Sequence, residues 1–294
     1  MTKNLEKQFI LGIGAQRTGS TWLRAQLHQC DQVNLGFCKE YHFFDVLYLP
    51  QMRAYHDLPE MGSGNIFQRM INEATSKRKS IADKTNRLTK FVQNPHRYFD
   101  YFDNLWAKNS NVTTVGDFTP SYSMLDRVAF EYARNELEKR GFRVKVVFIM
   151  RDPVERIWSM NHQEAKMKQA LKAGHDLSKR QFSLESFTYE DAELRTRYER
   201  TIHELEQVFD TRDIYCDFYE RYISKDRFKV LTKFLCLKCE DPDVLNVRNA
   251  SHMKGNIETT LAAEVANYYK STYDFVEARF GKEVCSLWTG YEYI

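Results

Sequence analysis

The sequence lacks an apolar run of the roughly 20 residues that a membrane span requires, so we expect none. The polar residues 1–8 do not have the pattern of a signal peptide, and we expect a cytoplasmic protein. The chain also lacks an excess of charge of one sign, with 43 basic against 40 acidic residues. This balance predicts no general attraction to nucleic acid or anionic lipid, so any anion site must be local.

The six cysteines lack the paired spacing that is typical of a zinc site. Cys236 and Cys239 form a lone C-x-x-C with no second half. We therefore interpret this pair as incidental thiols in a reducing compartment, and we expect no metal.

The sequence has no internal repeat, low-complexity tract or linker that would split it. A length of 294 residues is near the upper limit for one core, so residues 1–294 are predicted to form a single domain. Apolar or β-branched runs predict strands at 9–13, 33–37, 112–118, 143–150 and 213–218. Helical patterns alternate with them at 21–28, 126–140, from 153 onward and at 225–237. This alternation predicts an α/β fold, a doubly wound parallel sheet with helical insertions.

Residues 14–21, directly after the first predicted strand, are nearly a phosphate-binding P-loop. The pattern G-x-x-x-x-G-K-[ST] fits except that its lysine position holds Ser20. Glycines permit a tight turn, and the N–H groups of the following helix point at an anion. The lost lysine normally reaches the β- and γ-phosphates, and the cation that remains is Arg17 within the loop. We therefore predict a shorter anionic group than a triphosphate; the alternative is a glycine turn with no ligand.

A second motif follows the most apolar predicted strand, where α/β sheets bind ligands. Arg151 lies in the loop, and Arg156 and Ser159 are three residues apart on one face of the next helix. Guanidinium and hydroxyl groups that converge at a helix start suit a second phosphate. The alternative is an ordinary helix start that Asp152 caps, with surface arginines.

The segment 39–45 carries a third candidate site. If it is extended, Glu40 and His42 share one face. A carboxylate and an imidazole placed in this way could accept a proton from an attacking hydroxyl. The alternative is a surface glutamate beside a hydrogen-bonded histidine and two core phenylalanines.

Taken together, these segments resemble the sulfotransferases that use 3′-phosphoadenosine 5′-phosphosulfate (PAPS), as a soluble, bacterial-type member would. In that family a modified P-loop holds the 5′-phosphosulfate, and a later arginine and serine, spaced like Arg151 and Ser159, hold the 3′-phosphate. Residues 218–220 resemble the family's late strand-to-helix segment, and residues 254–255 resemble its glycine loop over the nucleotide. The donor-binding residues that the resemblance implies are Arg17, Thr18, Gly19, Ser20, Thr21, Trp22, Arg151, Ser159, Lys254 and Gly255.

The segment 39–45 is similar to the K-E-x-x-F-F element of the heparan-type glycan sulfotransferases, in which the glutamate is the proposed base. The catalytic residues that this resemblance implies are Glu40, His42 and Arg17. The acceptor-binding residues that it implies are Glu40, His42, Asp45, Ser121 and Tyr122. The chain departs from the pattern at Phe118, where heparan-type enzymes carry a lysine.

The resemblance implies transfer of a sulfuryl group from PAPS to a hydroxyl, or less readily an amine, of a glycan or small molecule. Adenosine 3′,5′-bisphosphate would be the product, and no metal would be needed. Two alternatives remain from the residues alone. One is a kinase with a degenerate P-loop; no acidic residue is clearly placed to serve its magnesium ion, and Asp117 is the one candidate. The other is a nucleotide-binding module that catalyses nothing.

Overall fold

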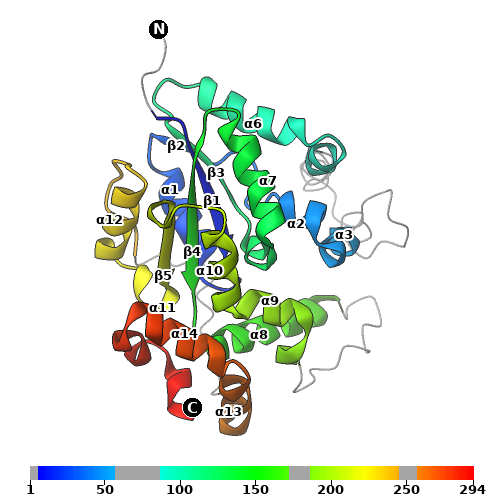
Figure 1. The fold of residues 1–294 in the computed structure, drawn as a ribbon, viewed down its shortest axis with the longest axis vertical. Helices are drawn as coiled ribbons and strands as arrows, with labels where there is room; N and C mark the ends of the chain where they lie inside the picture. The colour runs from blue at the N-terminus through cyan, green and yellow to red at the C-terminus, as the bar shows by residue number, and fades with distance from the viewer. Residues whose placement is uncertain (1–5, 57–86, 172–185, 245–256) are drawn as a thin grey trace.

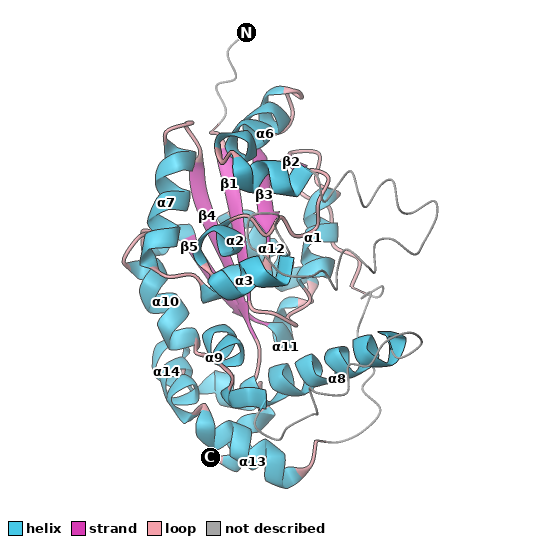
Figure 2. Cartoon of the chain, turned by 90° about the vertical axis from the view of Figure 1, so that its right-hand side faces the viewer, coloured by secondary structure: helices cyan, strands magenta, loops and turns pink. Residues whose placement is uncertain are grey.

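A computed structural model describes residues 6–56, 87–171, 186–244 and 257–294. These residues form an α/β fold in which helices cover both faces of a five-stranded sheet (Figure 1 and Figure 2). The strands, in the spatial order β2-β3-β1-β4-β5, are β2 (Val33–Asn34), β3 (Thr114–Phe118), β1 (Gln8–Gly14), β4 (Arg143–Met150) and β5 (Ile214–Phe218). All neighbouring strands pair in parallel, which confirms the predicted fold class.

The helices that precede β4 are α1 (Ser20–His28), α2 (Phe44–Tyr48), α3 (Pro50–His56), α6 (His96–Ala107) and α7 (Arg127–Glu138). Those that follow it are α8 (Pro153–Leu171), α9 (Glu190–Thr196), α10 (Tyr198–Glu206), α11 (Tyr219–Tyr222), α12 (Lys225–Phe234), α13 (Thr259–Tyr268) and α14 (Lys270–Phe280). Short 3₁₀ turns are η1 (Pro120–Met124), η2 (Ser186–Thr188), η3 (Thr211–Asp213), η4 (Lys282–Ser286) and η5 (Thr289–Tyr293). Within the described ranges, no helix combines the length and apolar character needed to cross a membrane.

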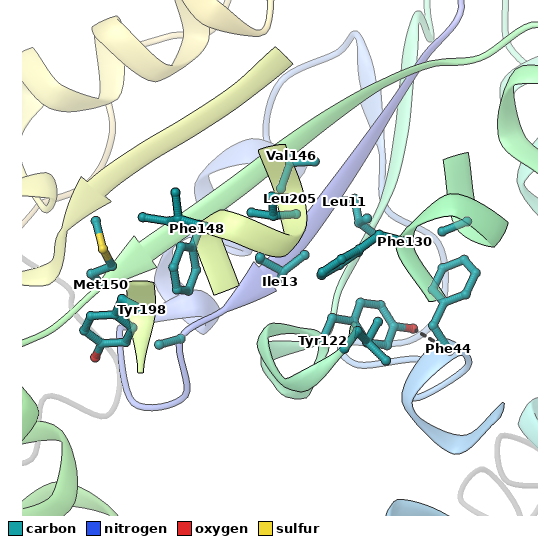
Figure 3. Close-up of a cluster of buried hydrophobic side chains, with 14 of the residues drawn as sticks. Leu11, Ile13, Phe44, Tyr122, Phe130, Val146, Phe148, Met150, Tyr198 and Leu205 are labelled. Carbon is teal, nitrogen blue, oxygen red and sulfur yellow. Dashed lines mark hydrogen bonds between the residues drawn. The ribbon is translucent and has the colours of Figure 1, made fainter. Parts of the chain in front are cut away.

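Alternate side chains of the buried strands serve two separate cores, because successive residues of a strand point to opposite faces. On one face, Ile10 packs with Trp22 and with the other inward residues of α1, and with α12. On the other face, Leu11 packs with Phe130 of α7 and Leu205 of α10 (Figure 3). The central strands are therefore apolar on both sides, as the sequence predicted. Helices packed on both faces of the sheet fix the strands whose carboxyl ends carry the loops described below.

One local prediction and one conditional assumption from the sequence differ from the structure in detail. The strand predicted at 33–37 covers only Val33–Asn34, and Gly36 turns the chain with a φ of 66°. The segment 39–45 is not an extended strand, because His42 adopts a left-handed conformation with φ 49° and α2 begins two residues later. The two phenylalanines of this segment, at 43 and 44, are both buried in the core.

The prediction that Cys236 and Cys239 are incidental thiols was wrong for Cys239, which forms a disulfide with Cys30. The two bonded cysteines are 209 residues apart, and their Cα atoms lie 5.0 Å from each other. The pair forms because α1 and α12 pack on the same face of the sheet, a long-range contact that the local C-x-x-C spacing cannot reveal. Since disulfides persist in oxidising compartments, the expectation of a reducing compartment loses the support it took from the cysteines.

Candidate functional site

The loop between β1 and α1 is a strained phosphate-type cradle. Arg17 has a φ of 70° and Gly19 a φ of 68°, so two residues adopt left-handed conformations. Such a conformation is costly for a residue with a side chain, and it is often found at ligand sites. Gly19 is the N-cap of α1 and offers no side chain to cap the first N–H groups of the helix, which leaves them for a ligand.

The Tyr222 side chain, from α11, holds this loop through hydrogen bonds. Its hydroxyl donates to the carbonyl oxygens of Thr18 and Gly19, each at 2.9 Å. A Cβ atom at position 19 would lie 2.7 Å from the same hydroxyl, so the glycine is required both for its conformation and for space. The late segment after β5 therefore supports the first loop of the chain.

The structure brings the two predicted phosphate motifs together. Arg17 donates from Nε to Ser159 Oγ at 2.9 Å and from Nη1 to Gln163 Oε1 at 2.6 Å. Arg151 donates from Nη1 to the carbonyl oxygen of Arg17 at 3.0 Å. Residues that are more than 130 positions apart in the chain thus surround one region at the start of α1 and α8.

Two guanidinium groups, those of Arg17 and Arg151, lie in this region. The Arg151 side chain is nine-tenths buried, its ion-pair partner is Glu155 at 3.2 Å, and its Nε is buried without a hydrogen-bond partner in the described chain. Burial, and then the charge of Arg151, lowers the pKa of Arg17. Two guanidinium groups held in this way favour an anion, since buried charges are ordinarily paired.

Arg156 lies three residues before Ser159 on α8, as predicted, but its guanidinium group has other partners than Arg17. It is fully buried, and it donates from Nη2 to the hydroxyl of Thr196 and to the carbonyl oxygen of Ala192. Burial lowers its pKa, and the neighbouring arginines add to that effect. Arg156 thus fastens α9 to α8 behind the site, and only Ser159 of the two contacts Arg17.

Sequence reasoning singled out the segment 218–220 but missed that Glu220 and C-terminal residues anchor the loop of Arg151. The backbone N–H of Asp152 donates to Glu220 Oε1 at 3.0 Å, and Trp288 Nε1 donates to Glu220 Oε2 at 3.1 Å. Asp152 in turn accepts from the N–H of Gly290 at 2.8 Å. Burial raises the pKa of Glu220 to about 7. The C-terminal residues are far from both motifs in sequence, so no local pattern could have indicated this role.

The predicted acceptor residues form a second cluster. His42 Nδ1 lies 2.8 Å from Asp45 Oδ2, and His42 Nε2 lies 3.4 Å from Glu40 Oε2. Lys39 Nζ contacts Glu40 Oε1 at 2.6 Å, and Ser121 donates to Asp45 Oδ2. Asp45 is fully buried, whereas the Glu40 and His42 side chains are partly exposed, at 28% and 21%. In this cluster Glu40 and His42 are therefore accessible to solvent, whereas Asp45 contacts His42 from within the protein.

The charges of this cluster oppose the effect of burial. Burial favours the neutral form of His42, but the Asp45 and Glu40 carboxylates outweigh it and raise the pKa of His42 to about 10. Burial likewise acts to raise the pKa of Glu40, but the hydrogen bond from His42 and the charge of Lys39 lower it to about 2. At neutral pH the cluster therefore contains an imidazolium between two carboxylates.

The acceptor cluster is adjacent to the phosphate-type loop. Thr119 donates its backbone N–H to the carbonyl oxygen of Gly12 at 2.9 Å. A Cβ at Gly14, where the loop begins, would lie 2.6 Å from the carbonyl oxygen of Pro120. Ser121 follows directly, so η1 carries part of the acceptor cluster past the end of β1.

Other predicted site residues have different surroundings. Ser20 and Thr21 form the first turn of α1 and are partly exposed. Trp22 is buried, donates from Nε1 to the carbonyl oxygen of Asp243 at 2.7 Å, and packs edge-to-face on Tyr222. Tyr122 is fully buried behind the acceptor cluster and not within it.

Phe118, at the position where heparan-type enzymes carry a lysine, is buried in the core on the α1 side of the sheet. Lys254 and Gly255 lie outside the described residues. In the described ranges, no group of three or more histidine, cysteine or carboxylate side chains is arranged to hold a metal ion.

No protein-family model and no curated protein matches the chain. Solved structures do match. A sulfotransferase from Alicyclobacillus acidocaldarius aligns with a TM-score of 0.57 at 16% identity, over 92% of this chain and 95% of that one. This chain has the sulfotransferase fold.

Two further matches are sulfotransferase domains. One, from the curacin biosynthetic pathway, has a TM-score of 0.47 at 19% identity, over 87% of this chain and 82% of that one. The other, from the Synechococcus PCC 7002 olefin synthase, has a TM-score of 0.46 at 19% identity, over 92% of this chain and 90% of that one. Of the three structures, the first exceeds a TM-score of 0.5, and the fold assignment rests on it.

Proposed function

We propose that this protein is a PAPS-dependent sulfotransferase that transfers a sulfuryl group to a hydroxyl of a glycan or other small acceptor. The observation that carries the proposal is the convergence of Arg17, Arg151 and Ser159 through hydrogen bonds, with Arg151 Nε buried and unpartnered among the described residues. Two separate anion-binding motifs suit a nucleotide with phosphate groups at both its 5′ and its 3′ positions. The sulfotransferase fold supports the same function by analogy.

The residues present fit this donor. The uncapped start of α1, at Ser20 and Thr21, and the side chain of Arg17 would hold the 5′-phosphosulfate. Arg151, through its unpartnered Nε, and Ser159 would hold the 3′-phosphate. When bound, the donor supplies the sulfuryl group and a bisphosphate leaving group. Arg17 and the loop N–H groups would stabilise the charge that develops on the bridging oxygen.

Glu40 would accept the proton of the acceptor hydroxyl, and His42 would orient Glu40. At neutral pH Glu40 is a carboxylate and His42 is protonated, which gives the glutamate the capacity to accept a proton. Asp45 and Ser121 would fix the His42 ring from behind. Lys39, which is exposed beside Glu40, would add positive charge on this side of the site.

The experiment that tests this function is incubation of the protein with isotope-labelled PAPS and panels of glycans, alcohols, phenols and amines, read by mass spectrometry. Expected is a labelled acceptor together with adenosine 3′,5′-bisphosphate, formed without added magnesium. Magnesium-dependent turnover of ATP would instead indicate a kinase. Tight binding of adenosine 3′,5′-bisphosphate with no transfer to any acceptor class would indicate a binding module.

A further inference from the structure

Asp117, at the end of β3, is the buried centre of a hydrogen-bond network behind the acceptor cluster. It is fully buried, and its two oxygens accept from three hydroxyl groups. Thr119 donates to Oδ1 at 2.7 Å, and Tyr122 and Tyr98 donate to Oδ2 at 2.6 and 2.9 Å. Both carboxylate oxygens of Asp117 are therefore used by hydroxyl groups within the core. We accordingly do not assign Asp117 to a magnesium ion, the role considered from the sequence.

Two of these hydroxyls also accept from the backbone of residues 41–44. Thr119 Oγ1 accepts from the N–H groups of residues 41 and 42, at 3.0 and 3.4 Å. The Tyr122 hydroxyl accepts from the N–H groups of residues 43 and 44, at 3.0 and 3.4 Å, the latter drawn in Figure 3. Four successive backbone N–H groups are therefore held by two hydroxyls that share one carboxylate.

This segment contains His42 in its left-handed conformation. A residue with a side chain holds that conformation at a cost of roughly 1–2 kcal/mol, so the surrounding contacts must enforce it. The conformation lets His42 contact Glu40 on one side and Asp45 on the other. In an extended segment, which we assumed in the sequence analysis, His42 would not adopt this left-handed conformation.

We propose that Asp117 is a positioning residue that acts through Thr119 and Tyr122 to hold Glu40 and His42 in their reactive arrangement. The carboxylate orients each hydroxyl by accepting its proton, which leaves the oxygen lone pairs directed at the backbone N–H groups. An amide at position 117 would donate to one of these hydroxyls, whose own proton would then lack its acceptor. As a statement about catalysis, this proposal rests on the proposed function.

The chain offers a matched pair of variants. Tyr122→Phe and Tyr98→Phe each remove one hydroxyl that donates to the same carboxylate oxygen. The Tyr122 hydroxyl also accepts from the backbone N–H groups of residues 43 and 44, so Tyr122→Phe removes these hydrogen bonds. The Tyr98 ring instead stacks on Phe43 at a centroid distance of 3.9 Å, and a phenylalanine at position 98 keeps that contact. Thr119→Val and Thr119→Ser form a second pair, because valine removes the hydroxyl and serine retains it.

Kinetics of the four variants provide the first test. Tyr122→Phe and Thr119→Val are expected to lower kcat by about 10- to 100-fold, because a misplacement of about 1 Å costs up to about that much. Tyr98→Phe and Thr119→Ser should stay within about twofold of the parent, and all four should bind adenosine 3′,5′-bisphosphate as the parent does. An equal loss of kcat in the two tyrosine variants, or full activity of Thr119→Val, would overturn the proposal.

A second readout does not depend on activity. NMR titration of the His42 imidazole, assigned with His42→Gln, should show its pKa moving from about 10 toward 6.5 in Tyr122→Phe and Thr119→Val. The Tyr98→Phe and Thr119→Ser proteins should titrate as the parent does. If the parent transfers no sulfuryl group but the titrations differ as expected, the function is wrong and the positioning role stands. Identical titrations in all variants would refute the positioning role itself.

Discussion

Replacement of Arg151 by methionine should remove the discrimination between adenosine 3′,5′-bisphosphate and AMP. Methionine keeps much of the aliphatic length but has no guanidinium group, so the contact with the 3′-phosphate is lost. One charge-assisted hydrogen bond contributes about 1.5–3 kcal/mol, and every 1.4 kcal/mol is about tenfold in affinity. The bisphosphate should therefore bind about 10- to 150-fold more weakly, whereas AMP binding should change by less than about twofold.

The Ser159→Ala variant should have a smaller effect than Arg151→Met. Ser159 already accepts from Arg17 Nε at 2.9 Å, and that hydrogen bond must break or rearrange when a phosphate binds. A neutral hydrogen bond contributes a net of about 0.5–1.5 kcal/mol, so the loss should be at most about tenfold. In turnover, both changes should raise the KM for the donor more than they lower kcat, because the 3′-phosphate is remote from the reacting sulfur.

Isothermal titration calorimetry at fixed ionic strength measures both nucleotides. Arg212→Met is the matched control, because Arg212 is 75% exposed and pairs with Asp210 on the surface. A control that weakens the bisphosphate as much as Arg151→Met does would mean that net charge, and not a specific contact, determines affinity. Equal loss for both nucleotides in Arg151→Met, or a parent protein that binds them equally, would refute the reasoning about two anion sites.

Three further predictions concern the acceptor cluster and the disulfide. Glu40→Gln should lower kcat by about 10²–10⁴-fold and leave calorimetric binding of adenosine 3′,5′-bisphosphate unchanged, while His42→Ala is milder; the reverse order would make His42 the base. The folded-state pKa of His42 is raised from 6.5 to about 10, so its stabilising contribution is complete below pH 6.5 and lost toward pH 10. The difference in Tm between the parent and His42→Gln should accordingly shrink over that range; a constant difference would contradict the shift. Cys30→Ser, which breaks the disulfide with Cys239, should cost about 2–5 kcal/mol in the free energy of unfolding, and an unchanged denaturation midpoint would contradict this.

Features that depend on a single helix, strand or loop were predicted well from the sequence. The apolar runs of β1 and β4 predicted buried parallel strands, and both are central in the sheet. The inward residues of α1 follow its helical period, and the loop before it could be identified by its glycines. These features depend on periodicity and local backbone conformation, which neighbouring residues specify.

Features that depend on distant elements could not be predicted. The disulfide between Cys30 and Cys239 depends on two helices packing on one face of the sheet. The left-handed conformation of His42 depends on hydroxyls almost 80 positions away, at Thr119 and Tyr122. A period-two pattern in the segment 39–45 therefore suggested the correct neighbours, Glu40 and His42, by an incorrect local structure.

The charges of the acceptor cluster restrict the choice of the base. A histidine whose pKa is raised to about 10 is protonated at neutral pH and cannot accept a proton. Glu40, with a pKa of about 2, is ionised but is a weak base, so it would accept the proton efficiently only after the acceptor oxygen has begun to bond to sulfur and its hydrogen has become acidic. The contact with His42 both orients Glu40 and keeps it ionised. On this reasoning the imidazolium would orient the base, and the network on Asp117 would affect catalysis because it holds the segment that carries His42.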